Sequence, residues 1–279
     1  MDFVPDYKIA LKQISAGGRF FGTYSQAYTV TNEKLCATMR FVPENCDEAL
    51  VVAGSGDHPL FCSLYGAKNV DTFDISYNAK CIMDIKVAAL QCLDYDEYKQ
   101  FLDSLYAKHN SLNPITEIAK MGEILPKLPK TERDYIYALR NVPMFSRGDA
   151  PKITGAVPTF CEYYNLRTKL IKPYNFLMSD ITNLSDSLTK SYDFMHLSNV
   201  FDYIKTSKYP ELVLELIKYI KPGGRIVTQF MNSGRDEVFG LYLHMAKKTD
   251  NNKNWDFYKK HIIQNSLYDN GVYVIERTR

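Results

Sequence analysis

An apolar run that ends in a glycine turn constrains the fold of this chain more than any other feature. The run spans residues 49–53 and leads directly into Gly54-Ser55-Gly56-Asp57, and Asp74 follows after one predicted helix. A continuous apolar strand is typical of a parallel sheet that helices cover on both faces. Glycine lets the backbone turn sharply beside a ligand, and a carboxylate accepts hydrogen bonds from ribose hydroxyls. The pattern indicates a nucleotide-like cofactor site at the first strand of an α/β sheet.

Composition and charge agree with a globular enzyme of one large domain or two. The chain has 279 residues, 46% of them hydrophobic and 24% charged, which argues against disorder and against a fibrous repeat. The formal net charge of +2 is small, and the sequence contains no long block of charges of one sign. The charge therefore gives no indication of nucleic acid as a partner.

Cysteine spacing and hydropathy narrow the cellular setting. None of the six cysteines lies in the two-residue spacing of a zinc or redox motif, so we expect reduced thiols and no metal. The first residues have neither a basic nor an apolar region of a signal peptide, and no stretch reaches the roughly 18 apolar residues of a membrane span. These observations predict a cytoplasmic protein without a transmembrane segment.

Periodicity predicts the remaining elements of the sheet and its helices. Further strands are expected at 70–73, 176–180, 192–197 and 225–230, and helices at 32–40, 57–65, 76–92 and from Pro210. Asn270-Gly271 is a strong hairpin signal between strands at 262–268 and 272–276, because both residues tolerate positive φ. The predicted fold class is α/β: a Rossmann-like, mostly parallel sheet with an antiparallel C-terminal hairpin and a helical insertion.

The insertion lies between Asp74 and the strand expected near residue 176. About a hundred residues separate the two, where a minimal doubly wound unit needs far fewer. Helical spacing occurs at 95–108, 115–125 and 131–139. The predicted division is a leader at 1–48, the first part of the cofactor-binding domain at 49–93, the insertion at 94–172 and the second part at 173–279. The insertion is interpreted either as a lid or substrate cap, or as a helical elaboration away from the site.

Four motifs in this order resemble a known family, the S-adenosylmethionine-dependent transferases of the Rossmann-like methyltransferase fold. They are Gly54-Ser55-Gly56, the strand-end Asp74, Ser179-Asp180-Ile181, and Lys221-Pro222-Gly223-Gly224 before a strand. The resemblance covers roughly 49–73 and 176–279. It implies S-adenosylmethionine as the cofactor and a transferase activity.

The resemblance also implies roles for individual residues. Gly54 and Gly56 would lie under the methionine part of the cofactor, and Asp74 would bind the ribose hydroxyls. Asp180 and the backbone of Ile181 would meet the adenine amino group, although an aspartate there is also a good cap for the next segment. The full set of expected cofactor-binding residues is Tyr24, Gly54, Ser55, Gly56, Asp57, Asp74, Ile75, Asp180, Ile181, Ser198 and Asn199.

The chain departs from the family pattern at two positions of the glycine turn. Val52 stands where the family usually has an acid that contacts the cofactor's amino group, and His58 stands where it usually has a glycine. Asp57 is the nearest carboxylate that could replace the missing acid. The Gly-Ser-Gly-Asp turn, Tyr24-Ser25-Gln26 and the long insertion resemble more narrowly the branch related to the aminocarboxypropyl transferases of betaine-lipid synthesis.

Several functions are compatible with these motifs. The first is a methyltransferase that acts on a small molecule or a lipid, and the second is an aminocarboxypropyl transferase. The third is a cofactor-binding relative without turnover, and the last is a dinucleotide oxidoreductase, against which His58 argues because that turn normally has a third small residue. No residue is assigned as catalytic, since a dry pocket can favour transfer from a sulfonium without a dedicated group. The sequence does not fix the oligomeric state.

Overall fold

The structure is a computed structural model, and it divides into two compact units. It describes residues 4–15, 22–25, 27–106, 118–139, 145–146, 155–170, 173–231, 234–250, 254–265 and 268–278. Unit 1 comprises Met1–Asn32, Ala53–Leu60 and Asp74–Met178, and unit 2 comprises Glu33–Val52, Phe61–Phe73 and Ser179–Arg279. The expected division into a leader, two halves of one domain and an insertion stays a prediction.

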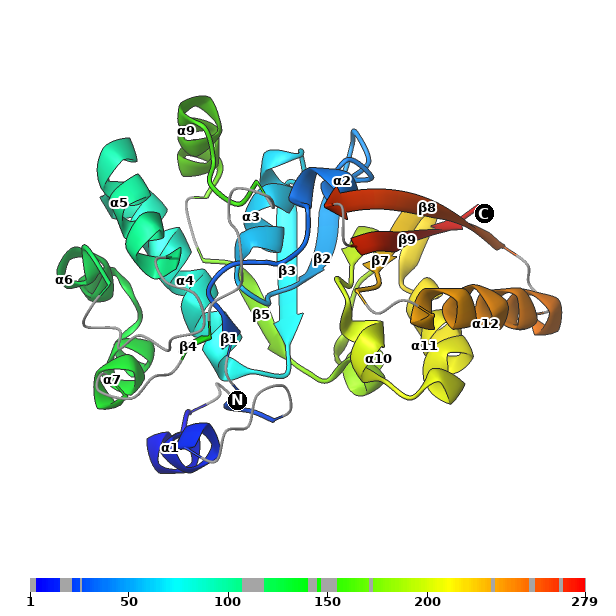
Figure 1. Cartoon of the computed structure of the whole chain (residues 1–279), viewed down its shortest axis with the longest axis horizontal. Coiled ribbons are helices and arrows are strands. Elements are labelled where there is room, and N and C mark those ends of the chain that lie inside the picture. The colour runs from blue at the N-terminus through cyan, green and yellow to red at the C-terminus, as the bar shows by residue number, and fades with distance from the viewer. Residues whose placement is uncertain are drawn as a thin grey trace. The chain divides into compact units, whose positions relative to one another are not determined.

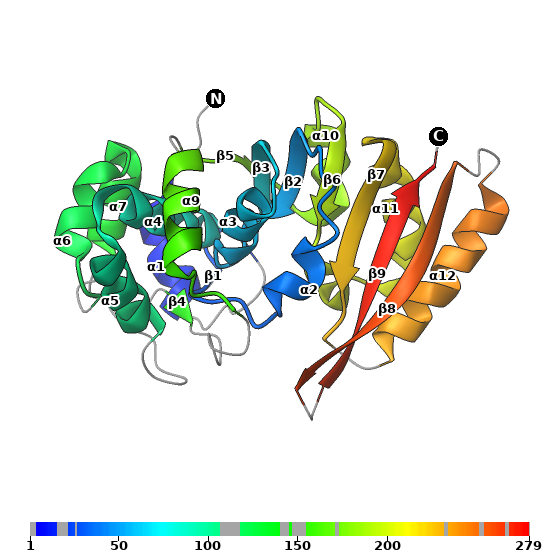
Figure 2. The ribbon, with the colours of Figure 1, turned by 90° about the horizontal axis from the view of Figure 1, so that it is seen from above.

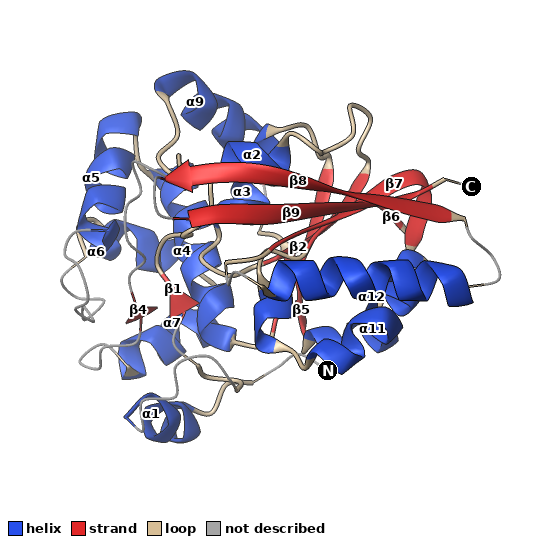
Figure 3. Ribbon diagram, turned by 45° about the vertical axis from the view of Figure 1, so that its right-hand side comes forward, coloured by secondary structure: helices blue, strands red, loops and turns tan. Residues whose placement is uncertain are grey.

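A seven-stranded sheet in the order β5-β3-β2-β6-β7-β9-β8 confirms the predicted fold class. The strands β3, β2, β6 and β7 pair in parallel, whereas β9 runs antiparallel to both β7 and β8. Their bounds are β2 Glu48–Val52, β3 Asn69–Asp74, β5 Asn175–Met178, β6 Tyr192–His196, β7 Ile220–Gln229, β8 Trp255–Asn265 and β9 Tyr268–Arg277. Figure 3 shows the long β8 and β9 side by side.

The centre of the sheet follows from the apolar run of the sequence. Ala49, Leu50 and Val51 of β2 are fully buried, as a strand with neighbours on both edges and cover on both faces requires. The chain passes from β2 outward to β3 on one side, and β6 lies on the other side of β2. The strand order therefore reverses between β2 and β6, and in open α/β sheets ligands bind outside the carboxyl ends of strands at such a point.

Helices of unit 2 lie against the antiparallel end of the sheet. Helices α11 (Tyr209–Ile217) and α12 (Arg235–Thr249) pack together, and they contact β7 and β8 respectively (Figure 1). α11 begins where Pro210 predicts a helix, but α12 is not predicted by the sequence. The other helices near this sheet are α2 Leu35–Met39, α3 Asp57–Leu64, η3 Ile181–Asn183, α10 Leu184–Ser187, η4 Val200–Tyr203 and η5 Thr206–Lys208.

Unit 1 is built around one long buried helix, α4 (Tyr77–Cys92). All residues of α4 except Lys80, Gln91 and Cys92 are buried, so the helix is covered almost all round and not only along one stripe. Helices of the predicted insertion pack on it, as Figure 2 shows for α5, α6 and α9. Their bounds are α5 Tyr95–Tyr106, α6 Met121–Ile124, η2 Leu125–Lys127, α7 Lys130–Ala138 and α9 Phe160–Lys169.

Three further features of unit 1 lie outside the sequence prediction. The helix α9 begins with a capping box, in which the Thr159 hydroxyl accepts from Glu162 N–H and the Glu162 carboxylate accepts from Thr159 N–H. A short parallel pair joins β1 (Ala27–Tyr28) to β4 (Phe145–Ser146), and α1 spans Tyr7–Ser15. Residues 107–108 of the helix expected at 95–108 and residues 115–117 of the helix expected at 115–125 lie outside the described residues.

The C-terminal hairpin exists, but its turn is not at Asn270-Gly271. These two residues lie within β9, where they pair with Ile262 and His261, and the connection between the strands is at residues 266–267, outside the described residues. Gly271 has a packing role here, because a Cβ at this position would lie 2.7 Å from Asp236 Oδ2 and 2.9 Å from Lys259 Cε. The glycine therefore marks a close approach of β9 to side chains of α12 and β8, and the sequence prediction of the turn is wrong.

The segment Lys221-Pro222-Gly223-Gly224 is also part of a strand and not a connection before one. β7 begins at Ile220, and its register to β6 shifts between the pairs Tyr192–Ile220 and Phe194–Arg225. The extra residues form a bulge in which Gly223 has a φ of +79°. The strand thus starts five residues earlier than the prediction at 225.

No helix among the described residues is long and apolar enough to cross a membrane.

Candidate functional site

The glycine turn after β2 has the backbone geometry that its sequence predicts. Gly54 and Gly56 have φ values of +50° and +81°, and Gly56 N–H donates to the Ala53 carbonyl at 2.7 Å. A Cβ at Gly56 would lie 2.8 Å from the Cα of Met83 in α4, whereas a Cβ at Gly54 would meet nothing within 4 Å. Gly56 therefore allows the turn to pack closely against α4. Gly54 lies on the open side of the turn, where a ligand can approach the backbone.

Asp74 lies beside this turn, as the sequence predicts for an acid at the end of the second strand. Its carboxylate accepts from Gly54 N–H at 2.9 Å and from Ser76 N–H at 2.9 Å. Burial raises the pKa of the Asp74 carboxyl, and hydrogen bonds from the Ser76, Gly54 and Ile75 backbone oppose that rise. Each carboxylate oxygen has a second lone pair, so the group can also accept from hydroxyls of a ligand.

Asp57 has an interior environment instead. The side chain is buried, and its carboxylate accepts from Thr31 N–H and Ser55 Oγ, each at 2.8 Å. It also accepts from the Lys86 ammonium and, at 3.4 Å, from the Tyr106 hydroxyl. Four donors thus surround the carboxylate that the sequence suggested as a direct contact for the cofactor's amino group.

Tyr24 and its neighbours hold the leader segment against the start of α4. The Tyr24 hydroxyl accepts from Asp6 N–H at 2.6 Å, and its ring stacks on Tyr135 at 6.0 Å between centroids. The Asn78 amide donates to the carbonyls of Tyr24 at 3.1 Å and Ser25 at 2.9 Å. Tyr24 therefore packs this segment next to the residues that follow Asp74.

The expected site residues of unit 2 lie at the ends of β5 and β6. Asp180 caps the short helix η3, since its Oδ1 accepts from the Thr182 N–H at 2.8 Å and from the Thr182 hydroxyl at 2.6 Å. Ser198 has a φ of +51°, which is rare for a residue with a side chain. Its hydroxyl donates to Glu33 and lies 3.3 Å from Asn199 Oδ1. A strained residue held in this way is typical of a functional position.

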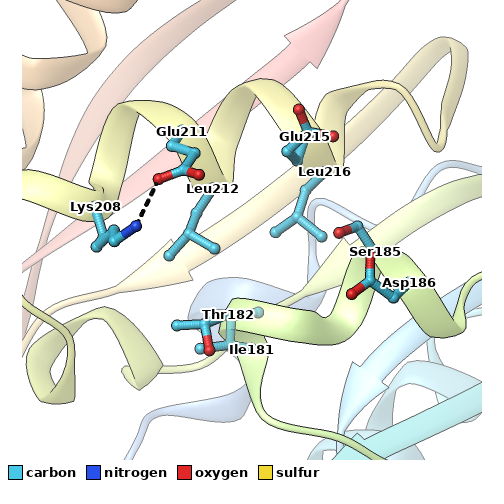
Figure 4. Close-up of a pocket in the computed structure, with 9 residues that line it drawn as sticks. All are labelled: Ile181, Thr182, Ser185, Asp186, Lys208, Glu211, Leu212, Glu215 and Leu216. Carbon is cyan, nitrogen blue, oxygen red and sulfur yellow. Dashed lines mark hydrogen bonds and ion pairs between the residues drawn. The ribbon is translucent and has the colours of Figure 1, made fainter.

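A pocket of unit 2 contains one of the expected residues. It has a volume of about 250 Å³ and lies between η3, α10 and α11 (Figure 4). Ile181, Leu212 and Leu216 form its apolar part, and its lining includes the carboxylates of Asp186, Glu211 and Glu215. Lys208 Nζ donates to Glu211 at 2.9 Å. The other expected site residues do not line this pocket.

Sequence reasoning missed two buried charged residues beside the expected site. Lys86 lies in the middle of α4, and its side chain is completely buried. Glu33 is also completely buried, and it accepts from Ser198. A lysine within the apolar stretch 82–90 was a usable signal, because a lysine is almost never buried unless it is paired.

Among known proteins, only solved structures are found to be similar to this chain. The sequence matches no protein-family model and no curated protein. An rRNA methylase from Streptococcus thermophilus is 9% identical with a TM-score of 0.39, and the match covers 86% of this chain and 92% of that one. A ribosomal protein L11 methylase from Lactobacillus delbrueckii subsp. bulgaricus is 12% identical with a TM-score of 0.42, over 86% and 74% of the two chains.

A third similar structure was solved with a cofactor product. It is the N-methyltransferase NodS from Bradyrhizobium japonicum WM9 in complex with S-adenosyl-L-homocysteine, 9% identical with a TM-score of 0.41, over 84% and 79% of the two chains. The expectation of a small-molecule or lipid partner, with no indication of nucleic acid, is corrected by these comparisons, because they include an rRNA methylase and a ribosomal protein methylase. The narrower resemblance to aminocarboxypropyl transferases stays a prediction.

Proposed function

We propose that the chain binds S-adenosylmethionine and transfers its methyl group. The observation that carries the proposal is the hydrogen bond from Gly54 N–H to the Asp74 carboxylate. It joins an open glycine turn to an acid at the end of the neighbouring parallel strand. Both follow strands whose carboxyl ends share one edge of the sheet, next to the point where the strand order reverses.

The described residues offer the polar groups that such a cofactor requires. Asp74 would accept from the ribose hydroxyls, and the turn at Gly54 and Gly56 would pass under the methionine part. Asp180, Ile181, Ser198 and Asn199 would meet the adenine and the transferring end, as the family resemblance implies. Tyr24, Ser55, Asp57 and Ile75 would complete the set, Tyr24 and Asp57 by supporting their segments and not by direct contact.

The chemistry places few demands on individual side chains. S-adenosylmethionine supplies a sulfonium carbon, whose attack by a nucleophile removes the positive charge from sulfur. The protein must hold that carbon in line with the acceptor and exclude water. No residue is therefore named as catalytic.

Calorimetry with S-adenosylhomocysteine tests cofactor binding. The wild-type chain is expected to bind, and Asp74→Asn is expected to bind about 10-fold to 100-fold more weakly, because a hydrogen bond to a charged group is worth about 1.5–3 kcal/mol. Asp47→Asn, which changes an exposed aspartate just before β2, is the matched control and should bind as the wild type does. Absence of binding by the wild-type chain would contradict the proposal.

Product analysis tests which group is transferred. S-adenosylhomocysteine is expected as the product of methyl transfer to an acceptor. Methylthioadenosine would instead identify aminocarboxypropyl transfer and overturn the methyltransferase assignment. Binding without either product, across acceptors of different classes, would favour a relative that has lost turnover.

A further inference from the structure

Packing does not explain why a lysine occupies position 86, because an apolar side chain could fill the same buried space. Lys86 lies in α4, its exposed fraction is 0%, and its ammonium donates to Asp57, whose side chain is 2% exposed. Taking an ammonium and a carboxylate out of water costs several kcal/mol for each ion, and a well-packed apolar pair of similar volume is often equally stable. The neighbouring positions of α4 are apolar, so a methionine would fill the same space.

The carboxylate of Asp57 connects segments that are far apart in the sequence. Besides Lys86 from α4, its donors come from Thr31 of the leader, Ser55 of the glycine turn and Tyr106 of α5. The Lys86 ammonium also lies 5.1 Å from the centroid of the Tyr106 ring. The ion pair is thus the centre of a buried polar network that includes the turn.

The same helix supports the turn a second time, one helical turn before Lys86. A Cβ at Gly56 would lie 2.8 Å from Met83 Cα and 3.5 Å from Lys86 Cδ. α4 therefore contacts the turn in two ways. Its backbone at Met83 packs closely against Gly56, and its Lys86 ammonium pairs with Asp57. Ser55, between the two glycines, is fixed by its own hydrogen bond to Asp57.

We propose that Lys86 is a positioning residue, which through Asp57 holds the turn at residues 54–56 in the geometry that receives the adenosyl donor. This inference rests on the proposed function. The ammonium orients the Asp57 carboxylate, and the carboxylate in turn fixes Ser55 and the direction of the Gly54 N–H toward Asp74. Burial lowers the pKa of the Lys86 ammonium, and the Asp57 carboxylate opposes that change.

A charge-free pair separates positioning from stability. The double variant Asp57→Asn/Lys86→Met keeps the volume and removes both charges, so it should unfold near the wild-type temperature. Its dissociation constant for S-adenosylhomocysteine is expected to rise about tenfold or more, and the amide hydrogens of residues 54–57 should exchange faster. The control is Lys80→Met/Asp84→Asn, which removes a Lys–Asp pair within α4 joined at 2.5 Å and should leave the binding unchanged.

The outcomes distinguish this inference from the function on which it rests. If the wild-type chain fails to bind S-adenosylhomocysteine, the proposed function is wrong. If it binds, and the folded double variant binds within about twofold of it, the positioning role is wrong. Should the double variant not fold, Lys86→Gln provides the second measurement, because glutamine keeps one donor for Asp57. Its affinity should then fall below the wild-type value, and an unchanged affinity overturns the inference.

Discussion

Two ion pairs of the chain, one in each unit, lie in opposite environments. In unit 1, the side chains of Lys86 and Asp57 are 0% and 2% exposed, and Lys80 of the same helix α4 reaches the buried Glu132 at 3.1 Å. In unit 2, the side chains of Lys68 and Asp47, near the starts of two strands, are 68% and 58% exposed. A buried pair is costly to break, whereas an exposed pair contributes little. The buried pair of unit 1 therefore fixes a conformation, whereas the exposed pair of unit 2 contributes little to stability.

The largest effect is expected for Asp57→Ala. The substitution leaves the buried Lys86 ammonium without its carboxylate and removes the acceptor of the Thr31 and Ser55 hydrogen bonds. Breaking a buried pair in this way lowers the free energy of unfolding by about 3–5 kcal/mol. Urea denaturation measures this loss. An unchanged affinity for S-adenosylhomocysteine in the folded variant would contradict our account of the turn.

The next largest effect is expected at Gly56, a tightly packed glycine of unit 1. It is compared with Gly66, a glycine of unit 2 that has open space around it. Gly56→Ala adds a Cβ at 2.8 Å from Met83 Cα to the strain of a φ of +81°. Gly66→Ala has only the strain, because its φ is +114° and nothing lies within 4 Å of the new Cβ. Strain costs about 1–3 kcal/mol and overpacking about 1–3 kcal/mol more, so thermal unfolding should show the larger loss at Gly56. Equal losses would mean that α4 does not confine the turn.

The pH dependence of unfolding tests a second buried charge cluster of unit 1, formed by Lys80, Asp84 and Glu132. Burial and the neighbouring Asp84 raise the pKa of the Glu132 carboxyl from 4.5 to about 8, although Lys80 opposes the rise. Because the folded state binds this proton more tightly than the unfolded state, its contribution to stability is complete below the unfolded pKa and is lost as the pH rises through the folded one. The free energy of unfolding should therefore fall between about pH 5 and pH 8.

Glu132→Gln is the control for that titration. Glutamine has no titrating carboxyl, so the decline that Glu132 causes should be absent from the variant. If the wild type and Glu132→Gln show the same pH profile of unfolding, the buried cluster does not titrate as proposed. Lys80 and Asp84 stay in place in both proteins, so their contribution is common to the two profiles.

The smallest effect is expected at the surface of unit 2. Lys68→Met removes an ammonium that lies 2.7 Å from Asp47 in an exposed pair. Water and salt screen such a pair, so the unfolding midpoint should not change measurably. A clear loss of stability at low and high salt alike would show that this exposed pair also stabilises unit 2, and the contrast between the two pairs would fail.

Local patterns predicted much of the fold because they act through neighbouring residues. The apolar run at 49–53 became the buried β2, and the helices expected at 57–65 and 76–92 exist with nearly the same bounds. The hairpin signal at Asn270-Gly271 failed, since glycine serves a turn and a close approach equally well. The cover of α4 by the insertion also escaped prediction, because periodicity shows one apolar stripe and not what packs on the other side.

The candidate site also has features that the sequence predicts and features that it does not. The sequence by itself determined the sharp glycine turn and the acid at the end of the next strand, because these depend on backbone sterics and on strand direction. Only the tertiary structure decided which acid does what. Asp74 reaches the Gly54 N–H, whereas Asp57 is enclosed by donors from four segments, one of them Lys86, 29 residues away. The pairing of buried charges depends on which segments pack together, and no local pattern encodes that choice.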